Sequence, residues 1–122
     1  MAWEFDSNKP IYIQIVNEIK IKIIAGDIPV GSKLDSVREL SQKAGVNPNT
    51  MQRALVTLEK EGLVYSQRTT GRYVTDDEEL IKKMREEYAR QKIEGFMKDL
   101  SKLGYQKQEL FELIKSYIGE LN

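Results

Sequence analysis

The sequence predicts a mostly helical α+β chain, in which a helix-rich N-terminal part with one small hairpin precedes two further helices. Three observations support this. Two short helices with polar caps and glycine stops fall within residues 36–62. Two β-prone runs then flank a Thr69-Thr70-Gly71 turn, and two amphipathic segments fill the remainder. A helix pair joined by a short turn and followed by a hairpin is a winged helix-turn-helix. We therefore expect that domain over residues 1–75 and a two-helix tail over residues 76–122.

The pattern of the first residues allows two interpretations for each segment. Trp3-Glu4-Phe5 alternates like a short strand but equally suits a frayed terminus. Residues 11–24 fit either a strand, through alternating isoleucines, or a helix that starts after Pro10. The length of the run and its polar opposite face favour the helix, and Gly26 is expected to end it. The helical stripe would consist of Tyr12, Ile15, Val16, Ile19 and Ile23.

The next two helices have clear boundary signals. Ser36 is an expected N-cap, and Glu39 three residues later completes a capping box. Gly45 would end this second helix. Asn47 caps a third helix that runs to about residue 61, where Gly62 stops it.

The remaining elements follow in order. The hairpin is expected to pair residues 63–66 with residues 72–75 around a loop of residues 67–71. A long helix would start at the acidic run Asp76–Glu79 and end near Gly104, and a last helix would cover residues 107–119. The acidic run resembles a metal site, but carboxylates at a helix start are explained by capping and the helix dipole. No metal site is expected.

Composition excludes several function classes. The sequence has no cysteine and no histidine, so it lacks thiolate nucleophiles, disulfides and the commonest general base. It also has no glycine-rich phosphate loop, so an enzyme is a remote reading and no cofactor is expected. No apolar run reaches membrane-spanning length, and the first residues lack the features of a signal peptide. A cytoplasmic protein is expected.

The net charge is zero, from 19 Lys/Arg and 19 Asp/Glu, but the charges are unevenly placed. Residues 1–75 carry a net charge of +2 and residues 76–122 a net charge of −2. Residues 36–75 alone carry +3, so the basic excess lies in the helix-turn-helix part. This weakly favours nucleic acid as a partner.

The third helix has an outward face that suits the DNA major groove. At about 100° per residue its apolar side chains share one face, and short amides, hydroxyls and an arginine lie opposite. Asn and Gln can pair with adenine, Arg with guanine, and a Thr methyl can meet thymine. An ordinary polar surface helix is the competing interpretation. The outward residues are Asn49, Thr50, Arg53 and Thr57, with Gln52 on the flank.

Arg38 and the wing tip can also be interpreted either as DNA contacts or as ordinary surface features. Arg38 could pair with Glu39 or Glu59, or reach a DNA phosphate. The wing tip places the cation of Arg68 beside two hydroxyls, which suits DNA or simply a solvated hairpin.

At these residues the chain resembles the GntR family of bacterial winged-helix regulators, and its short tail resembles the YtrA-type subfamily. The resemblance covers about residues 10–75. Its motifs are Pro10-Ile11-Tyr12-x-Gln14-Ile15, Gly26 with Gly31, Leu34-x-Ser36-Val37-Arg38-Glu39-Leu40, Gly45-Val46-Asn47, Thr50-x-x-x-Ala54-Leu55, Glu61-Gly62-Leu63-Val64 and Gly71-Arg72-Tyr73-Val74.

The resemblance implies a homodimer that binds operator DNA. It implies that Arg38 contacts phosphate or base with Ser36 nearby, and that residues 68–70 lie in or near the minor groove. Two departures stand out: Asp35 replaces a usual proline, and Thr69 replaces a common wing glycine. The implied DNA-binding residues are Ser36, Arg38, Asn47, Asn49, Thr50, Gln52, Arg53, Arg68, Thr69 and Thr70.

The two tail helices carry apolar stripes that a two-helix unit cannot bury by itself. A second copy of the chain is the simplest cover, and the resemblance implies the same dimer. A ligand pocket using Tyr88, Phe96 and Tyr105 is the competing use, and no effector is identified. The expected interface residues are Ile81, Met84, Tyr88, Phe96, Met97, Leu100, Phe111, Ile114 and Ile118.

The leading hypothesis is therefore a homodimeric, sequence-specific regulator, expected to act as a repressor on an inverted-repeat operator in double-stranded DNA. The alternative is a winged-helix protein-interaction module that binds no DNA.

Overall fold

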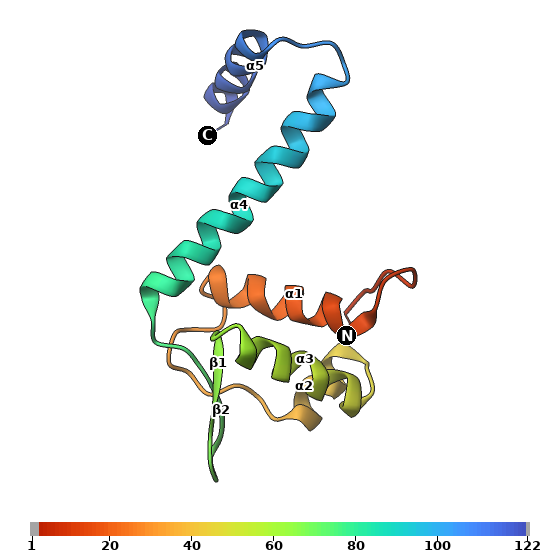
Figure 1. Ribbon diagram of the computed structural model, residues 1–122, viewed down its shortest axis with the longest axis vertical. Helices are drawn as coiled ribbons and strands as arrows, with labels where there is room; N and C mark the ends of the chain where they lie inside the picture. Colours follow the sequence, from red (N-terminus) through yellow and green to blue (C-terminus); the bar gives the residue numbers. More distant parts are fainter. Residues whose placement is uncertain (1–2, 122) are drawn as a thin grey trace. The chain divides into compact units, whose positions relative to one another are not determined.

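The computed structural model describes residues 3–121, so residues 1–2 and 122 at the ends of the two expected domains lie outside it. The observed elements confirm a mostly helical chain with one small hairpin (Figure 1). They are α1 (Ile11–Ile24), α2 (Val37–Ala44), α3 (Pro48–Lys60), β1 (Val64–Gln67), β2 (Gly71–Val74), α4 (Glu78–Ser101) and α5 (Lys107–Glu120).

The chain forms two compact units that divide within α4, one ending at Arg85 and the other starting at Glu86. The sequence expectation places the division earlier, at residues 75 and 76. The difference arises because the first turns of α4 bury side chains in the N-terminal unit, which a helix-start signal does not reveal.

The core of the first unit lies between α1, α3 and the base of the hairpin. In Figure 1, α1 and α3 run side by side. The residues buried by α1 are spaced as a helix stripe, so the helical interpretation of residues 11–24 is confirmed and the strand alternative is wrong. The fully buried large side chains are Ile15, Ile19, Ile23, Met51, Leu55, Leu58, Leu63, Val64 and Val74.

The N-terminal segment is neither a strand nor a frayed end. The Trp3 amide donates to the Ala44 carbonyl at 3.2 Å, and no strand is assigned to residues 3–6. Trp3 and Phe5 both pack against the core. Two exposed aromatic rings would otherwise leave apolar area in water, so burial decides the conformation.

The helix-turn-helix boundaries are set by local hydrogen bonds. Ser36 Oγ accepts from the Glu39 amide at 3.1 Å, and the Glu39 carboxylate accepts from the Ser36 amide at 3.0 Å. This second bond lowers the pKa of Glu39, because it stabilises the ionised carboxylate. Gly45 ends α2 with a φ of 73°, a left-handed conformation that favours glycine. Asn47 Oδ1 then accepts from the Asn49 amide at 2.7 Å. Both predicted caps are confirmed.

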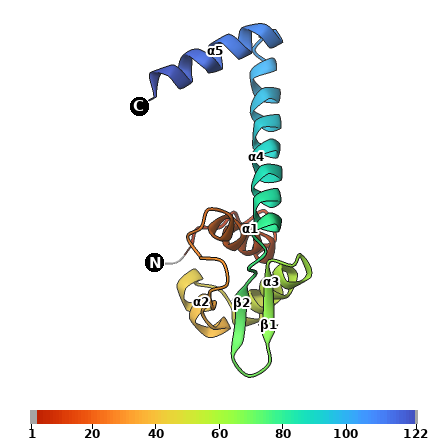
Figure 2. The same ribbon diagram turned by 90° about the vertical axis from the view of Figure 1, so that its left-hand side faces the viewer.

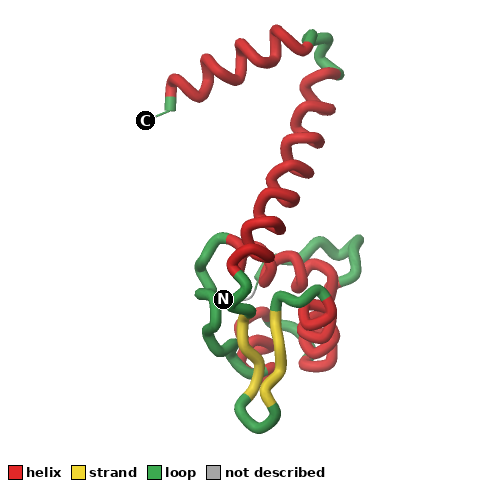
Figure 3. The backbone as a smooth tube through the Cα atoms, turned by 60° about the vertical axis from the view of Figure 1, so that its left-hand side comes forward, coloured by secondary structure: helices red, strands yellow, loops and turns green. Residues whose placement is uncertain are grey.

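The hairpin forms the wing, which we define as residues 64–74. β1 and β2 are antiparallel, with Val64 opposite Val74 and Gln67 opposite Gly71, and the loop consists of residues 68–70 (Figures 2 and 3). The strands start and end one residue away from the predicted limits, because Leu63 is buried in the core before the pairing begins. The Leu34 amide donates to the Arg72 carbonyl at 2.9 Å, which ties the segment before α2 to the outer edge of β2.

The start of α4 belongs to the first unit. Asp77 Oδ1 accepts from the Leu80 amide at 3.1 Å, which confirms the capping interpretation of the acidic run. Ile81 is only 4% exposed within the core, and Met84 packs against it. Both residues were expected in the dimer interface. Their burial in the chain's own core removes Ile81, and the packed face of Met84, from that surface.

The second unit leaves much of its apolar surface exposed. Leu110 is the one buried side chain among residues 86–121. No helix of residues 3–121 is both long and apolar enough to cross a membrane. The exposed large apolar residues of this unit are Ile93, Phe96, Leu103, Tyr105, Phe111, Leu113, Tyr117, Ile118 and Leu121.

Candidate nucleic-acid interface

The N-terminal half of α3 presents the polar face that the sequence predicts. Asn49, Gln52 and Arg53 are exposed, whereas Thr50 and Thr57 are half-buried. The opposite face, from Met51 to Leu58, is buried in the core. Thr57 Oγ1 donates to the Arg53 carbonyl at 3.0 Å, so this hydroxyl is already bonded within α3.

The two asparagines at the start of α3 differ in what they can offer. Asn47 uses its side-chain oxygen as the helix cap, which leaves its amide N–H groups as donors. Asn49 is exposed, and its side chain has no hydrogen-bond partner within residues 3–121. It can therefore both donate and accept toward a ligand.

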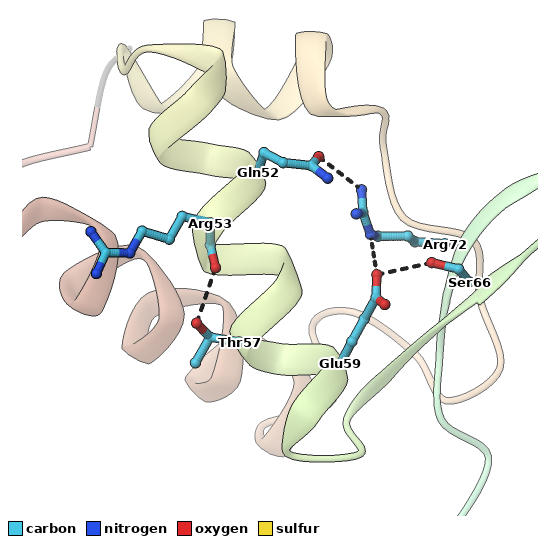
Figure 4. A network of polar contacts seen from close by, with 6 residues as sticks. All are labelled: Gln52, Arg53, Thr57, Glu59, Ser66 and Arg72. Carbon is cyan, nitrogen blue, oxygen red and sulfur yellow. Dashed lines mark hydrogen bonds and ion pairs between the residues drawn. The ribbon is translucent and has the colours of Figure 1, made fainter.

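Arg53 lies against the first turn of α1. Its guanidinium carbon is 3.8 Å from the centroid of the Tyr12 ring, which is cation–π stacking distance. Figure 4 shows Arg53 and Gln52 leaving α3 in opposite directions. Asn49, Thr50 and Arg53 share a surface hollow with residues 10–12. The structure thus groups these three side chains with α1 and separates them from Gln52.

A polar network joins the other side of α3 to the wing (Figure 4). Arg72 Nε donates to Glu59 Oε1 at 2.5 Å, and Ser66 Oγ donates to the same oxygen at 2.9 Å. Arg72 Nη1 donates to Gln52 Oε1 at 3.4 Å. The bond from Arg72, followed by that from Ser66, lowers the pKa of Glu59 against the effect of its burial. The network fixes the wing to α3.

Because Glu59 is ionised in this network, the free energy of unfolding should depend on pH through this residue. The pKa of Glu59 in the folded state is below its ordinary value of 4.5. The contribution of Glu59 to the free energy of unfolding is therefore complete above pH 4.5, and it is lost as the pH falls through the lowered pKa. Glu59→Gln should therefore lower the free energy of unfolding by about 1 kcal/mol at neutral pH, and by less at an acidic pH well below 4.5, where the carboxylate becomes protonated. Urea unfolding at both pH values measures this difference.

Glu87→Gln, on an exposed part of α4, is the control for this substitution. An equal effect of Glu59→Gln at both pH values would contradict the assignment.

On α2, Arg38 is free for a ligand. It is exposed and makes no ion pair within the described part of the chain. The two partners that the sequence allows are occupied, because Glu39 closes the capping box and Glu59 binds Arg72. Of the two sequence alternatives for Arg38, pairing within the chain is thus wrong.

The negative charge of Asp35 is locally compensated. Its carboxylate pairs with Lys43 at 2.5 Å, and the hydrogen bond to Asp35 raises the pKa of Lys43. The Lys43 side chain is 63% exposed and that of Asp35 40%, so the pair adds little stability, but it offsets the negative charge of Asp35 beside the start of α2.

The wing and the start of α2 meet at a second hollow. It brings Ser36 together with Thr70 and Gly71 of the wing, and Lys33 also lines it. The loop residues Arg68, Thr69 and Thr70 are all exposed. Thr70 Oγ1 donates to Gln67 Oε1 at 3.3 Å. The loop can therefore reach a ligand beyond the end of the hairpin.

Two residues that line the candidate interface, Tyr12 and Lys33, are absent from the DNA-binding residues expected from the sequence. Tyr12 fits the apolar stripe of α1, so its contact with a residue 41 positions away gives no sequence signal. Lys33 lies in a connecting loop with no periodicity. A Cβ built on Gly71 would lie 3.1 Å from Lys33 Cε, so this lysine packs closely on the wing. The φ of 119° at Gly71 favours glycine at that position.

Comparisons with known proteins identify the family of the chain. The family model described as "Bacterial regulatory proteins, gntR family" matches residues 11–74, more than half of the chain. The chain belongs to the gntR family. The match covers α1 through β2, which is the helix-turn-helix and the wing together.

Two curated relatives from Bacillus subtilis are informative about the subfamily. The uncharacterized HTH-type transcriptional regulator YhcF is 36% identical over 114 residues, covering 93% of this chain and 94% of that protein. The HTH-type transcriptional repressor YtrA is 39% identical over 71 residues, covering 58% of this chain and 55% of that protein. These matches confirm the resemblance seen in the sequence.

Solved structures agree with the fold. A GntR family transcriptional regulator from Listeria monocytogenes has a TM-score of 0.84 and 43% identity, covering 92% of this chain and 98% of that one. The structure of AraR(DBD) in complex with operator ORX1 has a TM-score of 0.53 and 30% identity, covering 62% of this chain and 92% of that one.

These findings place the chain among the DNA-binding transcriptional regulators of the gntR family. The proteins it matches are named as regulators and not as enzymes, which agrees with the sequence expectation. Within residues 3–121 no group of three or more metal-ligating side chains is assembled.

Proposed function

We propose that this gntR-family protein is a homodimeric repressor that binds an inverted-repeat operator. The observation that supports the dimer is the surface of the second unit. Of the 14 large apolar residues that are exposed in the described chain, nine belong to residues 86–121. Exposed apolar residues that gather on two helices in this way are typical of an interaction surface.

A second copy is the occupant that best fits this surface. Both helices present their apolar residues at helical spacing, so the same surface can face itself about a two-fold axis and build a four-helix core. The proposed interface retains Tyr88, Phe96, Met97, Leu100, Phe111, Ile114 and Ile118.

The DNA contacts are proposed for the polar surface of the first unit. α3 would enter the major groove with Asn49 and Gln52 toward base edges, while Asn47, Thr50 and Ser36 lie near the backbone. Residues 68–70 would lie in or near the minor groove. Two recognition helices in a dimer would contact half-sites about one helical turn, ~34 Å, apart.

Repression is supported by the repressor named among the relatives. A dimer seated on a promoter excludes polymerase without any further chemistry. Such a protein would act in the cytoplasm, where bacterial DNA lies.

Fluorescence anisotropy with DNA from upstream of the protein's own gene tests the proposal. We expect binding to an inverted repeat in that DNA, with an affinity that falls steeply with salt and exceeds that for a scrambled duplex by about 10³-fold or more. Equal affinity for both duplexes would contradict sequence-specific binding. Absence of any binding would favour the protein-interaction alternative.

Arg38 is proposed to contact a phosphate from α2. Arg38→Ala should weaken binding to operator and scrambled duplexes by the same factor, and reduce the slope of log affinity against log salt by about 1 per protomer. Titrations at several salt concentrations measure both effects. Lys60→Ala, at the far end of α3, removes the same charge and serves as the control. A loss confined to one operator base pair would instead make Arg38 a base contact.

A further inference from the structure

The network between α3 and the wing has a consequence for the bases that Gln52 can recognise. Arg72 extends from β2 toward α3, and its Nη1 faces the side-chain oxygen of Gln52 at 3.4 Å. Figure 4 shows the two side chains directed toward each other. Gln52 is exposed on the polar face of α3, so its remaining atoms are available to a ligand.

The chemistry of arginine fixes the orientation of the glutamine amide. A guanidinium carries five N–H donors and no acceptor, so only the oxygen of Gln52 can face it. The amide NH₂ of Gln52 must then point elsewhere. In this arrangement Gln52 presents donors outward and keeps its acceptor turned to the wing.

Arg72 is itself held in place from the opposite side. Its Nε donates to Glu59, which also accepts from Ser66, and the side chains of Arg72 and Glu59 are only 19% and 29% exposed. The low pKa of Glu59 keeps this carboxylate ionised at neutral pH. The backbone of Arg72 is also fixed, because β2 pairs with β1 and its carbonyl accepts from the Leu34 amide.

We infer that Arg72 is a positioning residue that sets the base preference of Gln52. A glutamine that pairs with adenine needs both its oxygen, for the N6 amino group, and its nitrogen, for N7. With the oxygen turned toward Arg72, the NH₂ group is the part of the Gln52 amide that faces a base. It needs an acceptor atom, and guanine offers two acceptors, N7 and O6. Gln52 should therefore favour guanine, whereas the sequence alone suggests adenine. This inference depends on the proposed insertion of α3 into the major groove.

The test compares operator duplexes that differ at a single base pair. Gln52→Ala first identifies the position, as the one where base discrimination is lost. At that position the wild-type protein should bind the guanine duplex best. Arg72→Met, which keeps an unbranched apolar stem but removes the guanidinium donors, should shift the adenine-to-guanine affinity ratio toward adenine by about fivefold or more.

Two further variants keep the inference testable if Arg72→Met is unstable. Glu59→Gln retains an oxygen for Arg72 and should leave the ratio within about twofold, although it loses charge. Gln52→Glu, at an exposed site, still accepts from Arg72 but has no donor, so the preference for guanine should disappear.

The outcomes separate a positioning role from a structural one. Equal weakening on all four duplexes by Arg72→Met, or a guanine preference that persists in Gln52→Glu, would overturn the inference. If the wild-type protein discriminates among no duplexes at all, the proposed operator recognition fails, and this inference fails with it.

Discussion

Ile118→Glu should convert the protein from a dimer to a monomer and lower its affinity for the complete operator by about 100-fold or more. Ile118 is 59% exposed on α5, within the surface that we propose for the second copy. A carboxylate buried without a partner in that interface costs several kcal/mol, so the monomer becomes the stable form. Each half-site is then bound separately, and the gain from linking two recognition helices is lost.

Ser116→Glu is the matched control for this substitution. Ser116 lies on the same helix, about 160° around its axis from Ile118, and is exposed. It introduces the same charge but should leave both the dimer and the operator affinity unchanged. Analytical ultracentrifugation and anisotropy measure the two properties. A dimer that survives Ile118→Glu with full operator affinity would show that the second copy does not cover this surface.

Arg53→Ala should weaken binding to every operator variant by a similar factor, about 10- to 100-fold, without altering base preference. The sequence places Arg53 among the base-side residues. In the structure it stacks on Tyr12 and points away from Gln52, toward the start of α1. We therefore propose that Arg53 contacts a phosphate on the flank of the major groove.

Tyr12 supplies the test of this position. Tyr12→Leu removes the cation–π contact but keeps an apolar side chain, and should weaken operator binding by about two- to fivefold. Because Tyr12 acts through Arg53, the double variant should bind no more weakly than Arg53→Ala alone. Additive losses in the double variant would mean that Tyr12 acts independently, and a change at one base pair in Arg53→Ala would restore its base-reading role.

The parts of the fold that the sequence predicts are those that depend on neighbouring residues. The Ser36–Glu39 capping box and the Asn47 cap each involve residues at most three positions apart, and both form as expected. The outward face of α3 follows from helical spacing alone.

The parts that escaped prediction depend on distant residues. The apolar stripe of α4 looks continuous in the sequence, yet Ile81 is buried in the first unit while Ile93 is exposed. The packing of Tyr12 on Arg53 and the bond from Arg72 to Gln52 join elements that only the tertiary fold brings together. These long-range contacts are the basis of the roles that we propose for Arg53 and Gln52, whereas the family and the fold class were recognisable from local motifs.

Methylation protection of guanine N7 on the operator tests most directly whether two copies of α3 occupy the major groove. The N7 atom lies in that groove, so protection reports the position of each recognition helix. We expect two protected clusters, one in each half of the inverted repeat. Their centres should lie about one helical turn (about 10 base pairs) or about two helical turns apart. Both clusters should disappear together in Ile118→Glu at protein concentrations that saturate the wild-type complex. A single protected cluster, or binding without any protection in the major groove, would contradict the account.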